Sequence, residues 1–241
     1  MAAILALVLP AAQVPAGAAD GAGAPVVSGF SPRAGYTIYD QITLTGANLA
    51  QTTAVSVAGK PAQFQVIADS MLSIELPHLA PGAYQLSITS PAGTTLSAGT
   101  YQVASLEAEV LRLVNIARAK KRKCGKTTYK AVKPVKLSPL LSAVATAHST
   151  DMATKDYFSH YSKSGGTPFT RMKAAGYRYS SAGENIAAGY GSPAATVAAW
   201  IKSPGHCKNI MKKTFTQMGV GYAEGGTYGD YWTQDFGKPK K

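Results

Sequence analysis

The chain has 241 residues and a formal net charge of +12, from 24 Lys and Arg against 12 Asp and Glu. Hydrophobic residues make up 46% and charged residues 15% of it, so a mainly disordered chain is excluded. No run of roughly 18 apolar residues occurs, so no membrane-spanning helix is expected.

The charge is unevenly distributed along the chain. Residues 1–105 carry two basic and four acidic side chains, a net charge of −2, whereas residues 106–241 carry 22 basic and eight acidic ones, a net charge of +14. Such asymmetry between the halves indicates two domains with different partners.

Residues 1–19 have the pattern of a secretory signal peptide. An apolar run from Ala2 to Leu9 precedes small residues that include an A-x-A-like cleavage site at Ala16–Ala18. A basic start is missing, which suggests a truncated or misassigned first residue. A disordered Ala-rich tail is disfavoured, because exposing the apolar run to water is costly. We therefore expect a secreted protein, extracellular or held in the cell envelope.

Residues 25–103 alternate apolar and polar side chains in short segments separated by turn residues. Period-two alternation with a turn about every ten residues predicts an antiparallel β-sandwich. The predicted strands are Tyr39–Thr45, Ala54–Ala58, Ser73–Leu76, Ala83–Thr89 and Gly99–Val103.

This segment resembles an IPT/TIG immunoglobulin-like domain. The resemblance rests on Val27–Pro32, Ile42–Leu49, Val55–Gly59 and Pro81–Tyr84. It implies an all-β sandwich that acts as a spacer or interaction module, and His78 is expected to be a loop residue.

After Ala104 the periodicity becomes helical. One helix is expected from Leu106, with Glu107 and Glu109 in its first turn and a basic end. A second is expected over Leu137–Phe158, with His148 on its buried stripe. Further on, the pattern predicts a Gly-rich connection at Gly183–Ala187, a short helix that starts near His206, and strands at Met218–Tyr222 and Tyr231–Gly237. This mixture indicates an α+β domain.

Five motifs in this half are similar to the bacterial, extracellular branch of the CAP superfamily. They are His148–Met152, Tyr157–His160, Gly183–Ala187, Ser203–His206 and Tyr231–Gly237. The resemblance covers about residues 106–237 and implies an α-β-α sandwich with a central cleft.

In that family two histidines and two acids line the cleft. His148, Glu184 and His206 match three of them, while Ser203 stands where the second acid usually lies. The two histidines with Glu184 can hold a divalent ion such as Zn or Mg. Without a metal, Glu184 can act as a base, or the trio can be a buried polar network. A serine nucleophile at Ser203 or Ser159 is disfavoured, because a GxSxG motif is missing.

His160, after an aromatic pair, is expected to be a structural cap at a helix end. The only two cysteines, Cys124 and Cys207, are far from CxxC spacing, so in an exported protein they predict a disulfide. It would contribute roughly 4–5 kcal/mol on the chain-entropy model. Two free buried thiols are the alternative.

The segment from Arg118 to Lys136 is strongly basic, with nine Lys and Arg. It is either a solvated loop or a surface that attracts an anionic polymer. Nucleic acid is disfavoured as a partner, because the segment has one aromatic residue, Tyr129, and no recognition motif.

These features favour a secreted, non-enzymatic binding module. Its cleft would hold a lipid, sterol-like or envelope-derived ligand, and its basic face would contact anionic surface polymers. The first alternative is a metal-assisted hydrolase that uses His148, His206 and Glu184; if the protein is an enzyme, a hydrolase is expected. The second is a structural or adhesin-like extracellular protein that acts through the IPT/TIG segment.

Overall fold

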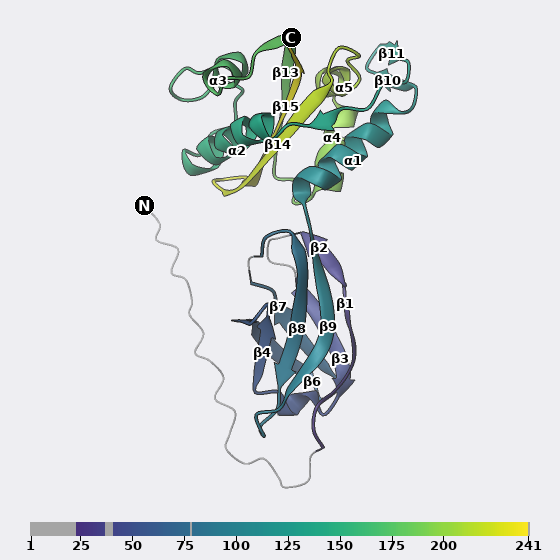
Figure 1. Cartoon of the computed structure of the whole chain (residues 1–241), viewed down its shortest axis with the longest axis vertical. Coiled ribbons are helices and arrows are strands. Elements are labelled where there is room, and N and C mark those ends of the chain that lie inside the picture. Colours follow the sequence, from purple (N-terminus) through teal and green to yellow (C-terminus); the bar gives the residue numbers. More distant parts are fainter. Residues whose placement is uncertain (1–22, 37–40, 78, 241) are drawn as a thin grey trace. The chain divides into compact units, whose positions relative to one another are not determined.

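The computed structural model describes residues 23–36, 41–77 and 79–240, and the chain divides after Val103 into two compact units (Figure 1). The predicted signal peptide at residues 1–19, residues Tyr39 and Asp40 of a predicted strand, and His78 lie outside the described residues.

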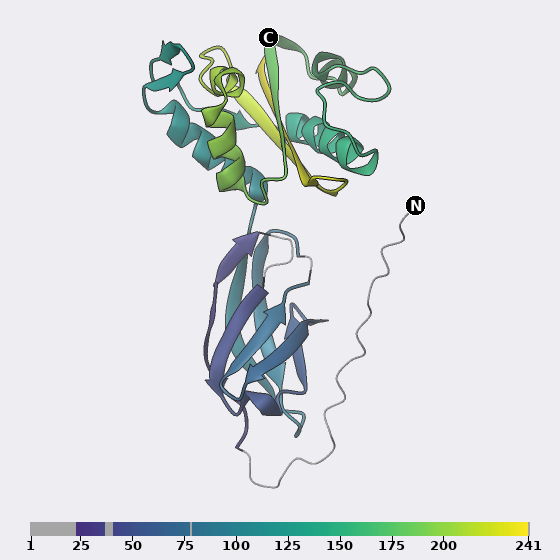
Figure 2. The same ribbon diagram turned by 180° about the vertical axis from the view of Figure 1, so that it is seen from behind.

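The first unit is a sandwich of two antiparallel sheets, as predicted. One sheet has the order β1-β3-β7-β6 and the other β2-β9-β8-β4-β5 (Figure 2). The alternation predicted for Ile42 and Leu44 is present, because both side chains are buried between the sheets. The strands are β1 Val26–Ser31, β2 Ala34–Tyr36, β3 Gln41–Ala47, β4 Ala54–Val57, β5 Lys60–Pro61, β6 Gln63–Ala68, β7 Met71–Glu75, β8 Gly82–Thr89 and β9 Thr95–Ala104, with a short 3-10 turn η1 at Leu49–Gln51.

The second unit is an α-β-α sandwich around a sheet of order β12-β14-β15-β13. Its strands are β12 Lys136–Leu137, β13 Tyr179–Ala188, β14 Gln217–Gly225 and β15 Gly229–Pro239, and β10 Arg122–Cys124 and β11 Thr127–Tyr129 form a separate hairpin. Its helices are α1 Leu106–Arg118, α2 Pro139–Thr154, α3 Pro168–Ala174, α4 Pro193–Lys202 and α5 Pro204–Ile210.

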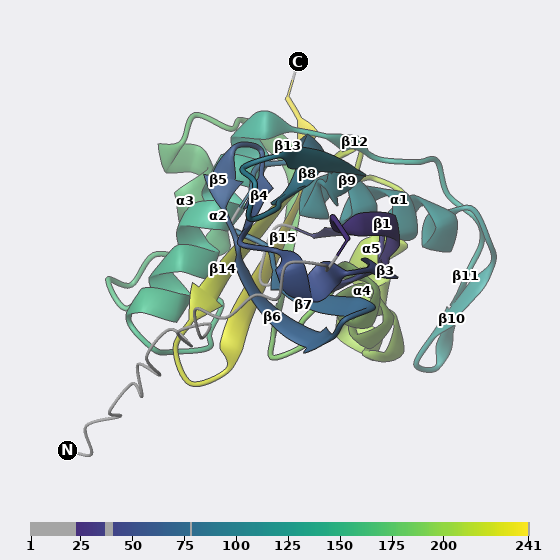
Figure 3. The same cartoon turned by 90° about the horizontal axis from the view of Figure 1, so that it is seen from below.

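The helices divide between the two faces of this sheet. Helices α2 and α3 lie on one side, and α1, α4 and α5 lie on the other (Figure 3). Side chains on β15 alternate accordingly: Tyr231 packs with Met152 of α2, whereas Trp232 packs with Trp200 of α4. The two faces therefore have separate apolar cores.

Two glycines on β14 allow α2 to lie directly on the sheet. A Cβ at Gly219 or at Gly221 would come within 2.1 Å of the α2 backbone, at Leu141 and Ala145 respectively. This close contact holds the first two turns of α2 against β14, and His148 follows within the next turn.

Several predicted elements differ in the structure. The second helix ends at Thr154 rather than at Phe158, and the left-handed Asp156 (φ 49°) lies just beyond it. Gly183–Ala187 is part of the edge strand β13 and not a connection. Helices α3 and α4 were not predicted, because their apolar stripes are short.

The basic segment forms the β10–β11 hairpin, which the predicted Cys124–Cys207 disulfide joins to α5 over a Cα–Cα distance of 5.5 Å. The sequence pattern grouped Arg118 with the basic surface segment. This was wrong, because the side chain of Arg118 is fully buried. Its guanidinium donates hydrogen bonds to the carbonyls of Lys133, Ile210 and Phe215. Arg118 thus satisfies loop carbonyls inside the domain.

Candidate functional site

His148 lies on the buried face of α2. Its Nε2 is 2.9 Å from the carbonyl oxygen of Ser159, so Nε2 carries the hydrogen and donates it. Its Nδ1 is then a buried acceptor without a partner among the described residues. Burial lowers the pKa of His148, while the negative charge of Glu184 partly opposes this shift. The imidazole is therefore neutral at pH 7.

Glu184 is the centre of a polar cluster, and it reaches that position from strand β13. Its Oε1 is 2.7 Å from Nδ1 of His160, and its Oε2 accepts a 2.6 Å hydrogen bond from Arg171 on α3. Arg171 also donates to the carbonyls of His160 and Gly166, so it holds the loop before α3. The side chain of Glu184 is almost fully buried.

Neither partner of Glu184 was predicted. His160 does not cap a helix, because α2 ends six residues earlier and His160 lies in the loop that folds back over β13. The helix that carries Arg171, α3, could have been found from the Thr167-Pro168 pair, an N-cap followed by a proline. The contact of Arg171 with Glu184 is a tertiary one and has no local signal.

Asp235 completes the cluster from the neighbouring strand, where it is the register partner of Glu184. Asp235 is fully buried, and neither of its carboxyl oxygens accepts a hydrogen bond from any of the described residues. Burial, and then the negative charge of Glu184, raise the pKa of Asp235 well above its ordinary value, against the opposing effect of Arg171. The carboxylate of Glu184 is the acceptor that a protonated Asp235 would donate to.

His206 lies on the first turn of α5, beside a pocket of about 260 Å³. Burial lowers the pKa of His206, and the nearby His160 adds to the shift. Ser203 lines the same pocket at the junction of α4 and α5, and its hydroxyl makes no capping hydrogen bond to α5. The pocket is lined by Phe158, Ile186, Ala187, Ala188, Tyr190, Ala199, Trp200, Ser203, His206 and Tyr228.

The backbone edge of β13 supports this pocket. Trp200 donates its indole N–H to the carbonyl of Ile186 at 3.0 Å, and Asn209 donates to the carbonyl of Glu184 at 3.0 Å. The disulfide at Cys207 anchors α5 directly beside His206. The pocket walls are therefore held by hydrogen bonds and one covalent link.

The structure thus places His148 and Glu184 in one cluster and His206 at its margin, with His160 between them. This donor set does not fit a divalent cation. Both oxygens of Glu184 are already engaged, one by the guanidinium of Arg171. No group of three or more His, Cys, Asp and Glu residues within the described ranges is arranged to hold a metal ion.

Comparison with known proteins agrees with this architecture. The model of the CAP family, the cysteine-rich secretory protein family, matches residues 111–236, and the IPT/TIG model matches residues 25–103. The chain belongs to the CAP family. None of the helices in the described residues is long and apolar enough to cross a membrane.

Among curated relatives, the uncharacterised protein YkwD of Bacillus subtilis is 43% identical over 59% of this chain and 51% of its own length. The uncharacterised membrane protein YlbC of the same organism is 34% identical over 54% of this chain and 34% of its own. The chain therefore spans about half of YkwD and a third of YlbC.

The similar solved structures are less identical in sequence. An extracellular SCP-domain protein of Bacillus anthracis is 21% identical, with a TM-score of 0.47 and 82% of each chain covered. Venom allergen-like protein 4 of Schistosoma mansoni is 14% identical, with a TM-score of 0.42 over 58% of this chain and 92% of its own.

Proposed function

We propose that this protein is an extracellular, non-enzymatic binding module whose CAP cleft holds the apolar or ring-shaped part of a lipid or other envelope-derived ligand. The observation that supports this function is the pocket beside His206. Three large aromatic side chains at its rim, Phe158, Tyr190 and Tyr228, remain 44–53% exposed. Exposed apolar surface gathered around a concave site is typical of a ligand-binding surface.

The size of the pocket limits the ligand. Its volume of about 260 Å³ lies just below the range of roughly 300–1,000 Å³ that is usual for ligand pockets. A sugar ring or a short acyl segment fits this space, whereas a whole lipid does not. His206 supplies a polar group at one side, which suits a ligand with one polar end.

The polar cluster beside the pocket favours binding over catalysis. A general base needs a free lone pair within reach of a substrate proton. Glu184 instead uses both oxygens inside the domain, and Asp235 is buried. The cluster therefore serves to fix the loop that carries Phe158 and His160 against β13.

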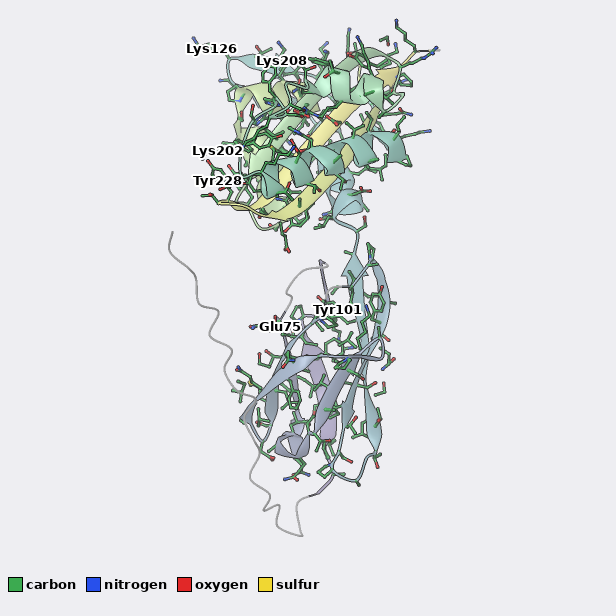
Figure 4. The ribbon with its side chains drawn as sticks, turned by 90° about the vertical axis from the view of Figure 1, so that its left-hand side faces the viewer. Glu75, Tyr101, Lys126, Lys202, Lys208 and Tyr228 are labelled. Carbon is green, nitrogen blue, oxygen red and sulfur yellow. A yellow bond between two sulfur atoms is a disulfide. The ribbon has the colours of Figure 1, made fainter. Side chains whose placement is uncertain are left out.

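A basic surface accompanies this pocket. Lys202, Lys208 and Lys126 extend from the same side of the unit as Tyr228 in Figure 4. All three lysines are exposed, and no ion pair in the described part of the chain engages them. Their charge favours an anionic envelope surface near the cleft. The disulfide supports a location outside the reducing cytoplasm.

The test is a titration of the full chain with two probes, a dansyl-labelled undecanoic acid and N-acetylmuramyl dipeptide. At least one probe should bind. Tyr228→Ala should weaken that binding by about five- to thirtyfold, since it removes an aromatic wall. Tyr161→Ala is the matched control, because Tyr161 is also a largely exposed tyrosine, 63% against 53% for Tyr228, but does not line the pocket. Binding of neither probe, or equal affinity of both variants, would overturn the proposal.

A further inference from the structure

A second cavity of the CAP domain lies away from the cleft. It has a volume of about 540 Å³ and is lined by Lys173, Gly176, Tyr177, Arg178, Tyr179 and Lys240. The end of α3, the start of β13 and the end of β15 meet there, at one end of the domain (Figures 1 and 2).

Local backbone structure brings these side chains together. Gly176 has a φ of 86°, and its N–H bonds to the carbonyl of Lys173, so the chain turns sharply from α3 into β13. The N–H of Lys240 donates to the carbonyl of Arg178 at 3.0 Å, which extends the β13–β15 pairing by one residue. Three cations from three elements therefore surround one cavity.

These three cations have no internal counterion. Within residues 79–240 and the other described ranges, no hydrogen bond or ion pair engages the side chain of Lys173, Arg178 or Lys240. No acidic side chain lines the cavity. Like charges in one concave site repel one another and attract an external anion.

Aromatic rings form the rest of the wall. Tyr179 is half-buried. Its ring stacks on that of Tyr177 with a centroid distance of 6.4 Å, and it also lies 6.4 Å from the ring of Phe169. Tyr177 is buried and donates its hydroxyl to Gln217 at 2.8 Å, and burial raises its pKa to about 12, so it stays a neutral support. Tyr177 needs the space at Gly237, where a Cβ would approach its hydroxyl to 2.3 Å. Tyr179 is thereby held rigidly as a ring platform beside the cations.

We propose that this cation–aromatic cavity, lined by the six residues named above, binds an anionic glycan through a sugar ring on Tyr179 and a phosphate or carboxylate on the cations. A neutral sugar would leave the three cations of the cavity without a counterion. The disulfide places the domain in an oxidising compartment, where charged glycans rather than nucleic acids are abundant. This inference gives the proposed attachment to an anionic surface a defined site, separate from the cleft.

The experiment measures binding of the full chain to four fluorescent polymers at low and moderate salt. They are polyglycerol phosphate, polygalacturonate, neutral dextran and a thymidine oligonucleotide. The test variant is Lys173→Gln/Arg178→Gln/Lys240→Gln. The matched control, Lys120→Gln/Lys121→Gln/Lys123→Gln, removes the same charge from exposed positions at and before the hairpin. Tyr179→Ser removes the ring platform without a change in charge.

We expect the parent protein to bind at least one charged glycan and not dextran. The cavity triple variant should weaken that binding about tenfold or more, the control triple about two- to threefold, and Tyr179→Ser about fivefold. Binding of polyglycerol phosphate alone identifies phosphate as the recognised anion, and binding of both glycans identifies the anion in general. Tyr228→Ala should leave this binding unchanged, so failure here is distinguishable from failure of the cleft proposal.

Three results would overturn the inference. Equal losses in the two triple variants would show diffuse attraction by net charge. Dextran binding as strong as that of the charged glycans would remove the role of the cations. Oligonucleotide binding tighter than that of both glycans would assign the cavity to nucleic acid.

Discussion

The two charged clusters of the CAP domain differ in how their charges are compensated. Around Glu184, the carboxylate contacts Arg171 and His160, and burial beside it raises the pKa of Asp235. Around Tyr179, three exposed cations surround a cavity with no acid. In the first cluster the carboxylate of Glu184 is paired inside the domain, although Nδ1 of His148 and Nε of Arg171 are buried without a partner among the described residues. In the second, open cluster the cations have no acid beside them, which is why we propose an external anion for it.

The largest effect that tests this comparison should come from Arg171. Arg171→Met removes the guanidinium that donates to Oε2 of Glu184, and it frees the loop before α3. Breaking a buried pair by removal of one partner costs about 3–5 kcal/mol. Urea denaturation should show this loss of unfolding free energy. Arg178→Met, in the open cluster, is the control and should change it by less than about 0.5 kcal/mol; equal losses would contradict the comparison.

A pH-dependent effect should come from Asp235. Its folded pKa is raised above 3.8, so the folded state keeps a proton that the unfolded state releases. The contribution of Asp235 to stability should therefore fall as pH rises above about 4, with a slope of at most about 1.4 kcal/mol per pH unit until the folded pKa is passed, and it is isolated as the difference between the parent and a variant at this site. Asp235→Asn mimics the protonated acid and should remove this slope. Thermal melts across pH 4–9 test it, and parallel curves for the two proteins would contradict the raised pKa of Asp235.

His148 should make stability change with pH in the opposite direction, below about pH 6.5. Its folded pKa is lowered from 6.5 by burial, so below about pH 6.5 the unfolded state binds a proton that the folded state resists. The stability that the neutral imidazole contributes is present above pH 6.5 and is lost as pH falls. His148→Gln should flatten this branch, which denaturant melts between pH 4.5 and 7 can measure. A histidine NMR titration that places its pKa above 6.5 would contradict the assignment.

The smallest effect on stability should come from the open cluster. In the Lys173→Gln/Arg178→Gln/Lys240→Gln variant, each substitution should change the free energy of unfolding by no more than about 0.5 kcal/mol, because the three side chains are exposed. The variant should nevertheless show the largest loss of glycan binding. A marked loss of stability in this variant would show that the cations are structural.

Much of the fold could be predicted from local pattern. The alternation at Ile42 and Leu44 indicated the sandwich, and the helical spacing from Leu106 indicated α1, because side-chain periodicity is set by backbone geometry. The Cys124–Cys207 pairing followed from composition. The end of α2 could not be predicted in this way, because no proline or glycine stops the helix. Packing on β14 and β15 decides its last turns.

The candidate site was predicted only in part. His148, Glu184, Ser203 and His206 were selected from motifs. His160 and Arg171 were missed, because their roles depend on a loop that folds back over β13. Asp235 lay inside a motif, but its buried pairing with Glu184 depends on the register of β13 against β15.

The amino-acid sequence by itself determined the two-domain order, the family of each domain, the disulfide and the basic charge of the second half. The domain order and the charge follow from composition and periodicity, the families from motifs that resemble known ones, and the disulfide from the presence of two cysteines in an exported chain. Tertiary structure alone decided which charges are compensated: Arg118 and Arg171 became buried supports, while Lys173, Arg178 and Lys240 stayed exposed. The physical reason is that the energy of a charge depends on the dielectric and the partners around it, which only the folded chain specifies.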